Sequence, residues 1–166
     1  VVYDHRNEGQ LESLTWPFAD LSFLLVHTRQ KLATHHHLQS VMLPFELFCL
    51  ADTVERAYDA FISADVEALL EAVRAYHKEL LRLNLVAAHT REAIDSFRQD
   101  NNILAAKGCG AMGSDVILLL VERSKRQALI QKLQHLSWTL LATETDLHKK
   151  MPLMTNNCHK TLEISA

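Results

Sequence analysis

The residues with the clearest chemical potential lie in one glycine-rich segment, "AAKGCGAMGSD", at positions 105–115. The chain has only four glycines, and those at positions 108, 110 and 113 all fall within this segment. Closely spaced glycines let a backbone approach a ligand, and their exposed N–H groups can bind an anion. Lys107 and Asp115 flank the glycines. The ammonium group is suited to a phosphate, and the carboxylate to holding the loop or meeting a cation.

A structural turn is the alternative to an anion-binding loop, and the spacing alone does not decide between them. The segment lacks the Walker pattern G-x-x-x-x-G-K-[ST], and its G-x-G-x-x-G spacing is not followed by a helical pattern, as a dinucleotide-binding loop requires. Cys109 would act as a nucleophile only beside a base. The sequence assigns none of the histidines to that place.

Three adjacent histidines, His35–His37, raise the question of a metal site. Neighbouring residues of a helix point about 100° apart, so these three imidazoles cannot converge on one ion. No H-E-x-x-H, paired-carboxylate or G-x-S-x-G motif is present. The sequence therefore predicts no metal site in this chain.

Composition limits the class of protein. The 166 residues are 48% hydrophobic and 22% charged, which is typical of one globular domain with its own core. A net charge of −3 gives no electrostatic reason to expect nucleic acid as a partner. The apolar run Val116–Val121 is far shorter than the ~20 residues of a membrane helix. Cys49, Cys109 and Cys158 are widely spaced without C-x-x-C, which favours the reducing cytoplasm.

The N-terminal third predicts strands followed by helices. Val1–His5 and Gln10–Trp16 form a hairpin around a turn at 6–9, and Leu21–Thr28 has the length and apolar character of a buried strand. One helix follows Pro44, with apolar residues at helical spacing. These residues are Leu47, Leu50, Val54, Tyr58 and Phe61.

A second helix begins after Ser63, a candidate N-cap, with Asp65 and Glu67 in its first turn. Thr90 is the candidate cap of a shorter third helix that buries Ile94 and Phe97. The buried stripe of the second helix comprises Val66, Leu69, Leu70, Val73, Tyr76, Leu80 and Leu81.

The C-terminal part predicts strands around the glycine segment. Ile103–Ala106 and Val116–Val121 are strands, Ser124 caps a helix that extends through Gln134, and "SWTLLATET" contains a last strand. Residues 149–166 form a polar tail. This order predicts an α+β fold: a ferredoxin-like, mainly antiparallel sheet with a helical block packed on one face and an enlarged first crossover.

The glycine segment and the apolar strand "VILLLV" after it resemble the third conserved motif of the GHMP small-molecule kinases. The form K-P-S-G-A-G-G-G-D, found in phosphomevalonate kinases, is the most similar. "FLLVHTRQKLAT" is similar to the family's strand and strand exit, which contributes Thr28 and Thr34, and the preceding hairpin is also similar. The matching positions of the glycine segment are Lys107, Gly110, Ala111, Gly113 and Asp115.

Three residues depart from that pattern. Gly108 replaces a proline, Cys109 a small serine or alanine, and Met112 a glycine. The Met112 side chain would crowd a loop that normally lets a phosphate or another backbone pass close by.

The resemblance implies the C-terminal half of a two-domain kinase, with residues 1–148 as the domain and the hairpin at 1–20 joining it to the missing N-terminal half. The ATP-phosphate loop P-x-x-x-G-L-G-S-S and the segment with the acceptor-activating aspartate are absent, so these residues alone are expected to be inactive and to hold no catalytic residue. The longer protein would use ATP and Mg²⁺ to phosphorylate phosphomevalonate or mevalonate in isoprenoid biosynthesis. The implied substrate-binding and phosphate-binding residues are Thr28, Arg29, Lys107, Gly108, Cys109, Gly110, Ala111, Gly113 and Asp115.

Two alternatives remain open at this point. One is a non-catalytic binding or assembly domain with the same half-fold, and the other is an enzyme similar to diphosphomevalonate decarboxylase. The expected partners are the small-molecule acceptor, ATP and the missing N-terminal domain. An apolar face left uncovered by that domain would also favour a homodimer.

Overall fold

The structure is a computed structural model that describes residues 2–4, 10–12, 14–29, 48–109 and 115–147. The predicted turn at 6–9, Thr34, His35–His37, the loop centre 110–114 and the predicted tail lie outside these residues. In chain order the elements are β1 (Val2–Asp4), β2 (Gln10–Glu12), β3 (Leu21–His27), α2 (Phe48–Ile62), α3 (Val66–Arg82), α4 (Ala88–Phe97), β4 (Ile103–Cys109), β5 (Val116–Glu122), η2 (Arg123–Lys125), α5 (Arg126–His135), β6 (Thr139–Thr143) and η3 (Glu144–Asp146).

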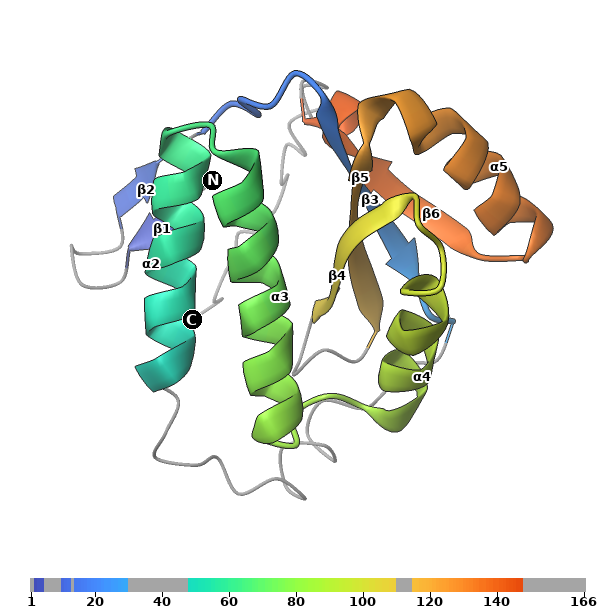
Figure 1. Cartoon of the computed structure of the whole chain (residues 1–166), viewed down its shortest axis with the longest axis horizontal. Coiled ribbons are helices and arrows are strands. Elements are labelled where there is room, and N and C mark those ends of the chain that lie inside the picture. Colours follow the sequence, from blue (N-terminus) through green and yellow to red (C-terminus); the bar gives the residue numbers. More distant parts are fainter. Residues whose placement is uncertain (1, 5–9, 13, 30–47, 110–114, 148–166) are drawn as a thin grey trace, which may run out of the picture.

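Four of the strands form one antiparallel sheet in the order β4-β5-β3-β6 (Figure 1). This is the strand order of a ferredoxin-like split β-α-β fold, in which β3 and β4 are parallel and β5 lies between them. The crossover from β3 to β4 contains α2, α3 and α4. The predicted α+β class and the enlarged first crossover are confirmed. β1 and β2 pair separately as the predicted hairpin.

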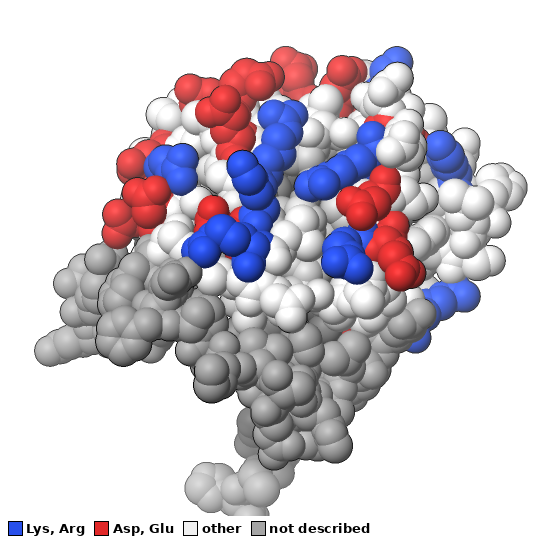
Figure 2. Space-filling view, turned by 60° about the horizontal axis from the view of Figure 1, so that its bottom comes forward, with Lys and Arg blue, Asp and Glu red and all other residues white. Residues whose placement is uncertain are grey.

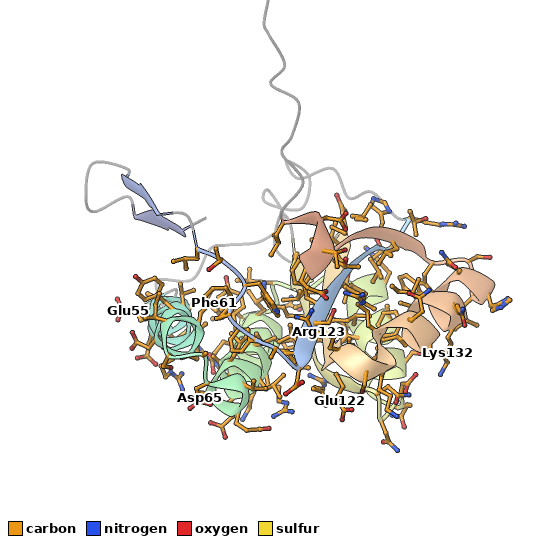
Figure 3. All side chains as sticks on the ribbon, turned by 90° about the horizontal axis from the view of Figure 1, so that it is seen from above. Glu55, Phe61, Asp65, Glu122, Arg123 and Lys132 are labelled. Carbon is orange, nitrogen blue, oxygen red and sulfur yellow. The ribbon has the colours of Figure 1, made fainter. Side chains whose placement is uncertain are left out.

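The helices cover both faces of this sheet, which adds a layer to the predicted arrangement. Seen from above, α2 and α3 lie on one side of the strands and α4 and α5 on the other (Figure 3). The buried residues accordingly form two clusters. Leu24, Val26 and Ile117 pack with α4 and α5, whereas Phe23 and Leu120 pack with α2 and α3.

Alternation along β3 explains why an apolar run forms this strand. Successive side chains of a strand point to opposite faces, so both faces of a central strand need apolar residues once helices cover each side. Leu21 through Leu24 and Val26 are all buried or nearly so. The β3–β5 ladder runs without interruption from Leu21 opposite Glu122 to His27 opposite Val116.

An aromatic cluster closes one end of the α2–α3 layer. Trp16, predicted as part of the hairpin strand, lies beyond β2 instead. Its indole N–H donates to the Leu21 carbonyl at 3.1 Å, and its ring meets Phe18, Phe23 and Phe61 edge-on at centroid distances of 5.1, 5.2 and 5.8 Å. Phe61 projects from α2 (Figure 3). This cluster packs the chain before β3 against α2.

The helix caps differ from those predicted. Asp65, not Ser63, is the N-cap of α3, and it accepts from the Ala68 N–H at 3.0 Å. The Ser63 hydroxyl donates back to the Asp59 carbonyl at the end of α2. Thr90 lies inside α4, which begins after Ala87. At α3 a second polar residue two positions on takes the capping role, whereas α4 begins after Ala87 with no side-chain cap.

The start of α5, the end of β4 and the buried stripe of α2 also differ from the prediction. Ser124 lies in the 3₁₀ turn η2, and α5 begins at Arg126. β4 continues beyond the predicted Ala106 to Cys109, so that part of the glycine segment is strand. On α2 the buried positions are Thr53 and Ala60, while Val54 is exposed.

One buried carboxylate joins β3 to the last helix and strand. Glu144 is only 4% exposed, and it accepts from the Ser22 hydroxyl and pairs with Arg126. Arg123, labelled in Figure 3, lies 3.5 Å from the same carboxylate and donates to the Phe18 carbonyl at 2.9 Å. The carboxylate therefore connects the start of β3 with η2, α5 and the end of β6.

Removing this carboxylate should destabilise the protein more than removing an exposed one. Because Glu144→Ala leaves Arg126 and Ser22 without their acceptor, we expect a loss of about 3 kcal/mol in the free energy of unfolding, measured by urea denaturation. Glu122→Ala, at an exposed position, is the control and should change it by less than about 0.5 kcal/mol. Equal effects of the two substitutions would show that the Glu144 network does not stabilise the fold.

Candidate functional site

The ends of four strands meet at one end of the sheet, and the glycine segment joins two of them. β3 and β4 finish there, and β5 and β6 begin there, because β3 and β4 are parallel to each other and antiparallel to the other two. Thr28, Lys107, Cys109 and Asp115 therefore belong to neighbouring strands at the same end. The topology brings together residues that are 87 positions apart in the sequence.

Thr28 and Asp115 are in direct contact. The Thr28 N–H donates to the Asp115 carbonyl at 2.9 Å, and the Thr28 hydroxyl donates to the same oxygen at 3.1 Å. These two bonds continue the β3–β5 ladder by one residue. They hold the C-terminal side of the glycine segment against the exit of β3.

Arg29 is turned toward the opposite edge of the sheet. Its backbone has a φ of 61°, a left-handed conformation that is uncommon for a residue other than glycine, and its N–H donates to His27 Nδ1 at 2.8 Å. Its Nε donates to the Thr139 hydroxyl of β6 at 3.2 Å. The predicted acceptor contact at Arg29 thus lies beside β6, whereas Lys107 is on β4, beyond β5.

Lys107 lies on the face of β4 that packs against α3. Its ammonium nitrogen is 4.9 Å from the centroid of the Tyr76 ring and 3.7 Å from the Cys109 sulfur. Burial, and secondarily the nearby Cys109, raise the pKa of the Tyr76 phenol. The lysine is therefore held by an aromatic face and a soft sulfur, and no described carboxylate forms an ion pair with it.

A pocket of about 270 Å³ opens beside this ammonium group. It lies between α2 and α3, and most of its lining is apolar. The described residues that line it are Thr53, Val54, Ala57, Ala72, Val73, Tyr76 and Lys107. A small ligand with an apolar portion and an anionic group would fit such a space.

Gly108 belongs to the other face of β4 because successive residues of a strand face opposite sides of the sheet. It is buried, as is Ala106 two residues earlier, on the face covered by α4 and α5. Among the predicted site residues, Thr28 contacts Asp115 and Lys107 contacts Cys109. Gly110, Ala111 and Gly113 lie outside the described residues, as does Met112.

His77 is fully buried in α3, and neither of its ring nitrogens has a hydrogen-bond partner among the described residues. Burial is the main reason that its pKa falls to about 4, and the positive charges of Arg98 and Lys107 lower it further while Asp95 opposes them. At neutral pH the imidazole is therefore uncharged, and it lies within electrostatic range of the Lys107 ammonium group.

Tyr76 and His77 were not predicted as site residues. The helical spacing of His77 from Val73 and Leu80 is the signal that places it in the buried stripe of α3. Tyr76 was predicted as part of that stripe, and the structure shows it half-buried beneath Lys107. The pairing of α3 with β4 could not be inferred from spacing, since it depends on the crossover.

The described residues contain no group of three or more histidine, cysteine or acidic side chains arranged to hold a metal ion. Neither Cys49 nor Cys109 forms a disulfide bond. None of the described helices has both the length and the apolar character needed to cross a membrane.

Several solved kinases share this fold. Phosphomevalonate kinase of Streptococcus pneumoniae, in complex with phosphomevalonate and AMPPNP, superposes with a TM-score of 0.64 at 19% identity, covering 81% of this chain and 42% of that one. L. major mevalonate kinase in complex with R-mevalonate superposes with a TM-score of 0.57 at 19% identity, covering 71% of this chain and 39% of that one. Methanococcus jannaschii mevalonate kinase superposes with a TM-score of 0.56 at 18% identity, covering 74% of this chain and 39% of that one.

These matches confirm the predicted resemblance to the GHMP kinases at the level of fold. No protein-family model and no curated protein matches the sequence. The chain spans about two-fifths of the length of the kinases it superposes on.

The buried imidazole predicts how stability depends on pH. The pKa of His77 is about 4 in the folded protein, below the value of about 6.5 in the unfolded chain. The unfolded chain therefore binds the proton first as the pH falls. This histidine should lower the free energy of unfolding progressively between about pH 6.5 and 4, by about 3 kcal/mol in total.

His77→Leu removes the titrating group and the unsatisfied nitrogens together. We expect urea denaturation to show a shallower loss of stability for this variant than for the wild type between those pH values. His135→Gln, at an exposed position on α5, is the matched control and should keep the wild-type slope. Identical slopes for His77→Leu and the wild type would contradict the assignment.

Proposed function

We propose that these 166 residues are the C-terminal part of an ATP-dependent small-molecule kinase of the GHMP superfamily. The observation that carries the proposal is the fold shared over 81% of the chain with a phosphomevalonate kinase, together with Lys107 and Asp115 on either side of the three glycines. The proposed acceptor is phosphomevalonate or mevalonate, which are the ligands bound in two of the similar structures.

In this proposal Lys107 binds the acceptor or the transferred phosphoryl group. Its ammonium group borders the pocket between α2 and α3, and a cation–π contact is weak enough to be exchanged for a phosphate. In the same proposal, the segment 108–113, which includes Cys109 and Ala111, supplies backbone N–H groups to the phosphate and lets the phosphate approach the backbone closely. Asp115 orders the segment through Thr28, whose double contact with the Asp115 carbonyl supports this role.

Phosphoryl transfer depends mainly on positioning and on stabilising the charge of the transferred group, because the protein contributes little covalent chemistry. We propose that ATP and Mg²⁺ are bound largely by a segment outside these residues, since the family's ATP-phosphate loop does not occur in this sequence. The acceptor-activating aspartate would come from the same segment. Thr28 and Arg29 are proposed acceptor contacts at the exit of β3. For Arg29 this requires that its side chain leave the Thr139 hydroxyl, because it is turned toward β6 and away from Lys107.

We place the protein in the cytoplasm, where Cys49 and Cys109 would remain reduced. A homodimer remains a second proposal for these residues in isolation. Val54 and Ile62 on α2, together with Leu141 on β6, are large apolar side chains that are at least half exposed.

The test is a screen of small acceptors with ATP, using the longer protein that contains these residues. We expect phosphorylation of a mevalonate-pathway acceptor, and Lys107→Ala should lower kcat/KM about 10²–10³-fold because a cation facing the transferred phosphate is lost. Lys125→Ala, an exposed lysine on η2, is the control and should retain wild-type activity. The 166 residues alone should show no turnover.

Thermal unfolding of each variant separates a loss of chemistry from a loss of folding. Absence of ATP-dependent transfer to every acceptor, in a folded protein, would instead favour a non-catalytic binding or assembly domain. Full activity of Lys107→Ala would overturn the role given to that lysine.

A further inference from the structure

A second pocket, of about 490 Å³, lies on the other flank of α3, between α3, α4 and β4. Helical spacing separates it from the Lys107 pocket: Arg74 and Lys78 project from nearly the opposite side of α3 to Tyr76. Its volume lies in the range of about 300–1,000 Å³ that is usual for small-molecule sites. The lining includes three basic residues and several aliphatic ones: Arg74, Lys78, Arg98, Leu81, Ile103 and Leu104.

A β-bulge positions the first of these cations. The pairing of β4 with β5 passes from Ile103 to Ala105, so that Leu104 has no partner in the ladder. Arg74 donates to the free Leu104 carbonyl from Nε at 3.2 Å and from Nη2 at 2.7 Å. Bulges often reorient groups in this way beside binding sites. The guanidinium is therefore held in a fixed orientation, and no described residue accepts from its Nη1.

The second cation repels the first. Lys78 lies four residues after Arg74 on the same face of α3, and like charges at this spacing destabilise a helix. Within the described part of the chain, neither side chain forms an ion pair with a carboxylate. A bound anion would relieve this repulsion.

The opposite wall carries the third cation. Arg98 follows the end of α4, and its one described ion pair, with Asp95, is long at 3.6 Å. No acidic residue is among the described residues that line the pocket. Figure 2 shows Lys and Arg side chains across the middle of the face that is turned forward, with acidic side chains along its upper and left edges and a further acidic group among the basic ones on the right.

We propose that this pocket binds a small organic phosphate, with the phosphate between Arg74, Lys78 and Arg98 and a short apolar body against β4. A phosphate monoester carries a charge of about −1.5 to −2 at neutral pH, which matches the two cations that form no ion pair with a described carboxylate. An oriented guanidinium suits the bidentate geometry of phosphate. Leu81 and Ile103 supply the apolar contact. The proposal does not depend on the phosphotransfer proposed above.

Binding is tested by calorimetric titration of the protein with n-butyl phosphate, inorganic phosphate, butyrate and n-butanol. We expect saturable binding of n-butyl phosphate, weaker binding of inorganic phosphate and butyrate, and none of n-butanol. Lys78→Gln keeps the contact between Arg74 and the bulge. This substitution should weaken the binding of n-butyl phosphate about tenfold, since a hydrogen bond to a charged group contributes about 1.5 kcal/mol or more.

The matched controls separate a site from general attraction. Lys125→Gln removes the same charge at an exposed position outside the pocket and should change the affinity less than about twofold. Arg74→Lys retains the positive charge but removes the paired N–H donors of the guanidinium group, so it should also weaken binding. Equal losses in Lys78→Gln and Lys125→Gln, or no saturable binding of n-butyl phosphate, would overturn the proposal.

His77 provides a second readout that does not depend on enzyme activity. The Arg98 charge contributes to the low pKa of this imidazole, so a phosphate bound beside Arg98 should raise that pKa. The histidine resonances, followed by NMR during a pH titration with and without n-butyl phosphate, measure the change. Calorimetric binding with no movement of the His77 midpoint would place the ligand elsewhere and overturn the assignment to this pocket.

Discussion

The pairing of β3 with β5 is the interaction on which the rest of the four-stranded sheet and its helices depend. Seven consecutive residue pairs join these strands, and their side chains supply buried residues to both faces. β4 and β6 each pair with one of them, and the helices of the described residues pack on the two faces of the resulting sheet. The final contact of this ladder, from Thr28 to the Asp115 carbonyl, sets the position of the glycine segment.

Two layers of helices on one sheet have a physical consequence for the candidate site. The layer formed by α4 and α5 belongs to the ferredoxin-like pattern, and the α2–α3 pair is an addition carried by the crossover. Because β4 lies at an edge of the four-stranded sheet, α3 borders a pocket on each of its flanks. One pocket is mainly apolar with Lys107 at its margin, and the other is lined by three cations. The same helix therefore contributes to both candidate binding surfaces.

Two buried polar groups illustrate opposite solutions to desolvation. Glu144 has a hydroxyl donor and two arginines around its carboxylate, which compensate for the loss of water. His77 has no hydrogen-bond partner among the described residues and avoids the cost of a buried charge by remaining neutral. The satisfied group lies where β3 starts and joins distant elements, whereas the unsatisfied one lies between the two pockets and near the basic side chains that border them.

The sequence by itself determined the classes of the elements and the segment in which chemistry is expected. Local periodicity, turn residues and the glycine spacing depend only on neighbouring residues, so the α+β class, the hairpin and the strands around the glycines were predictable. The predicted caps Ser63, Thr90 and Ser124 were wrong: Asp65 takes the place of Ser63, and α4 and α5 begin without a side-chain cap. Only the tertiary structure decided that Lys107 lies over Tyr76, that Arg29 turns to β6, and that Arg74 meets the bulge at Leu104. Those contacts join residues from different elements, and their geometry follows from how the crossover helices pack on the sheet, which no local pattern encodes.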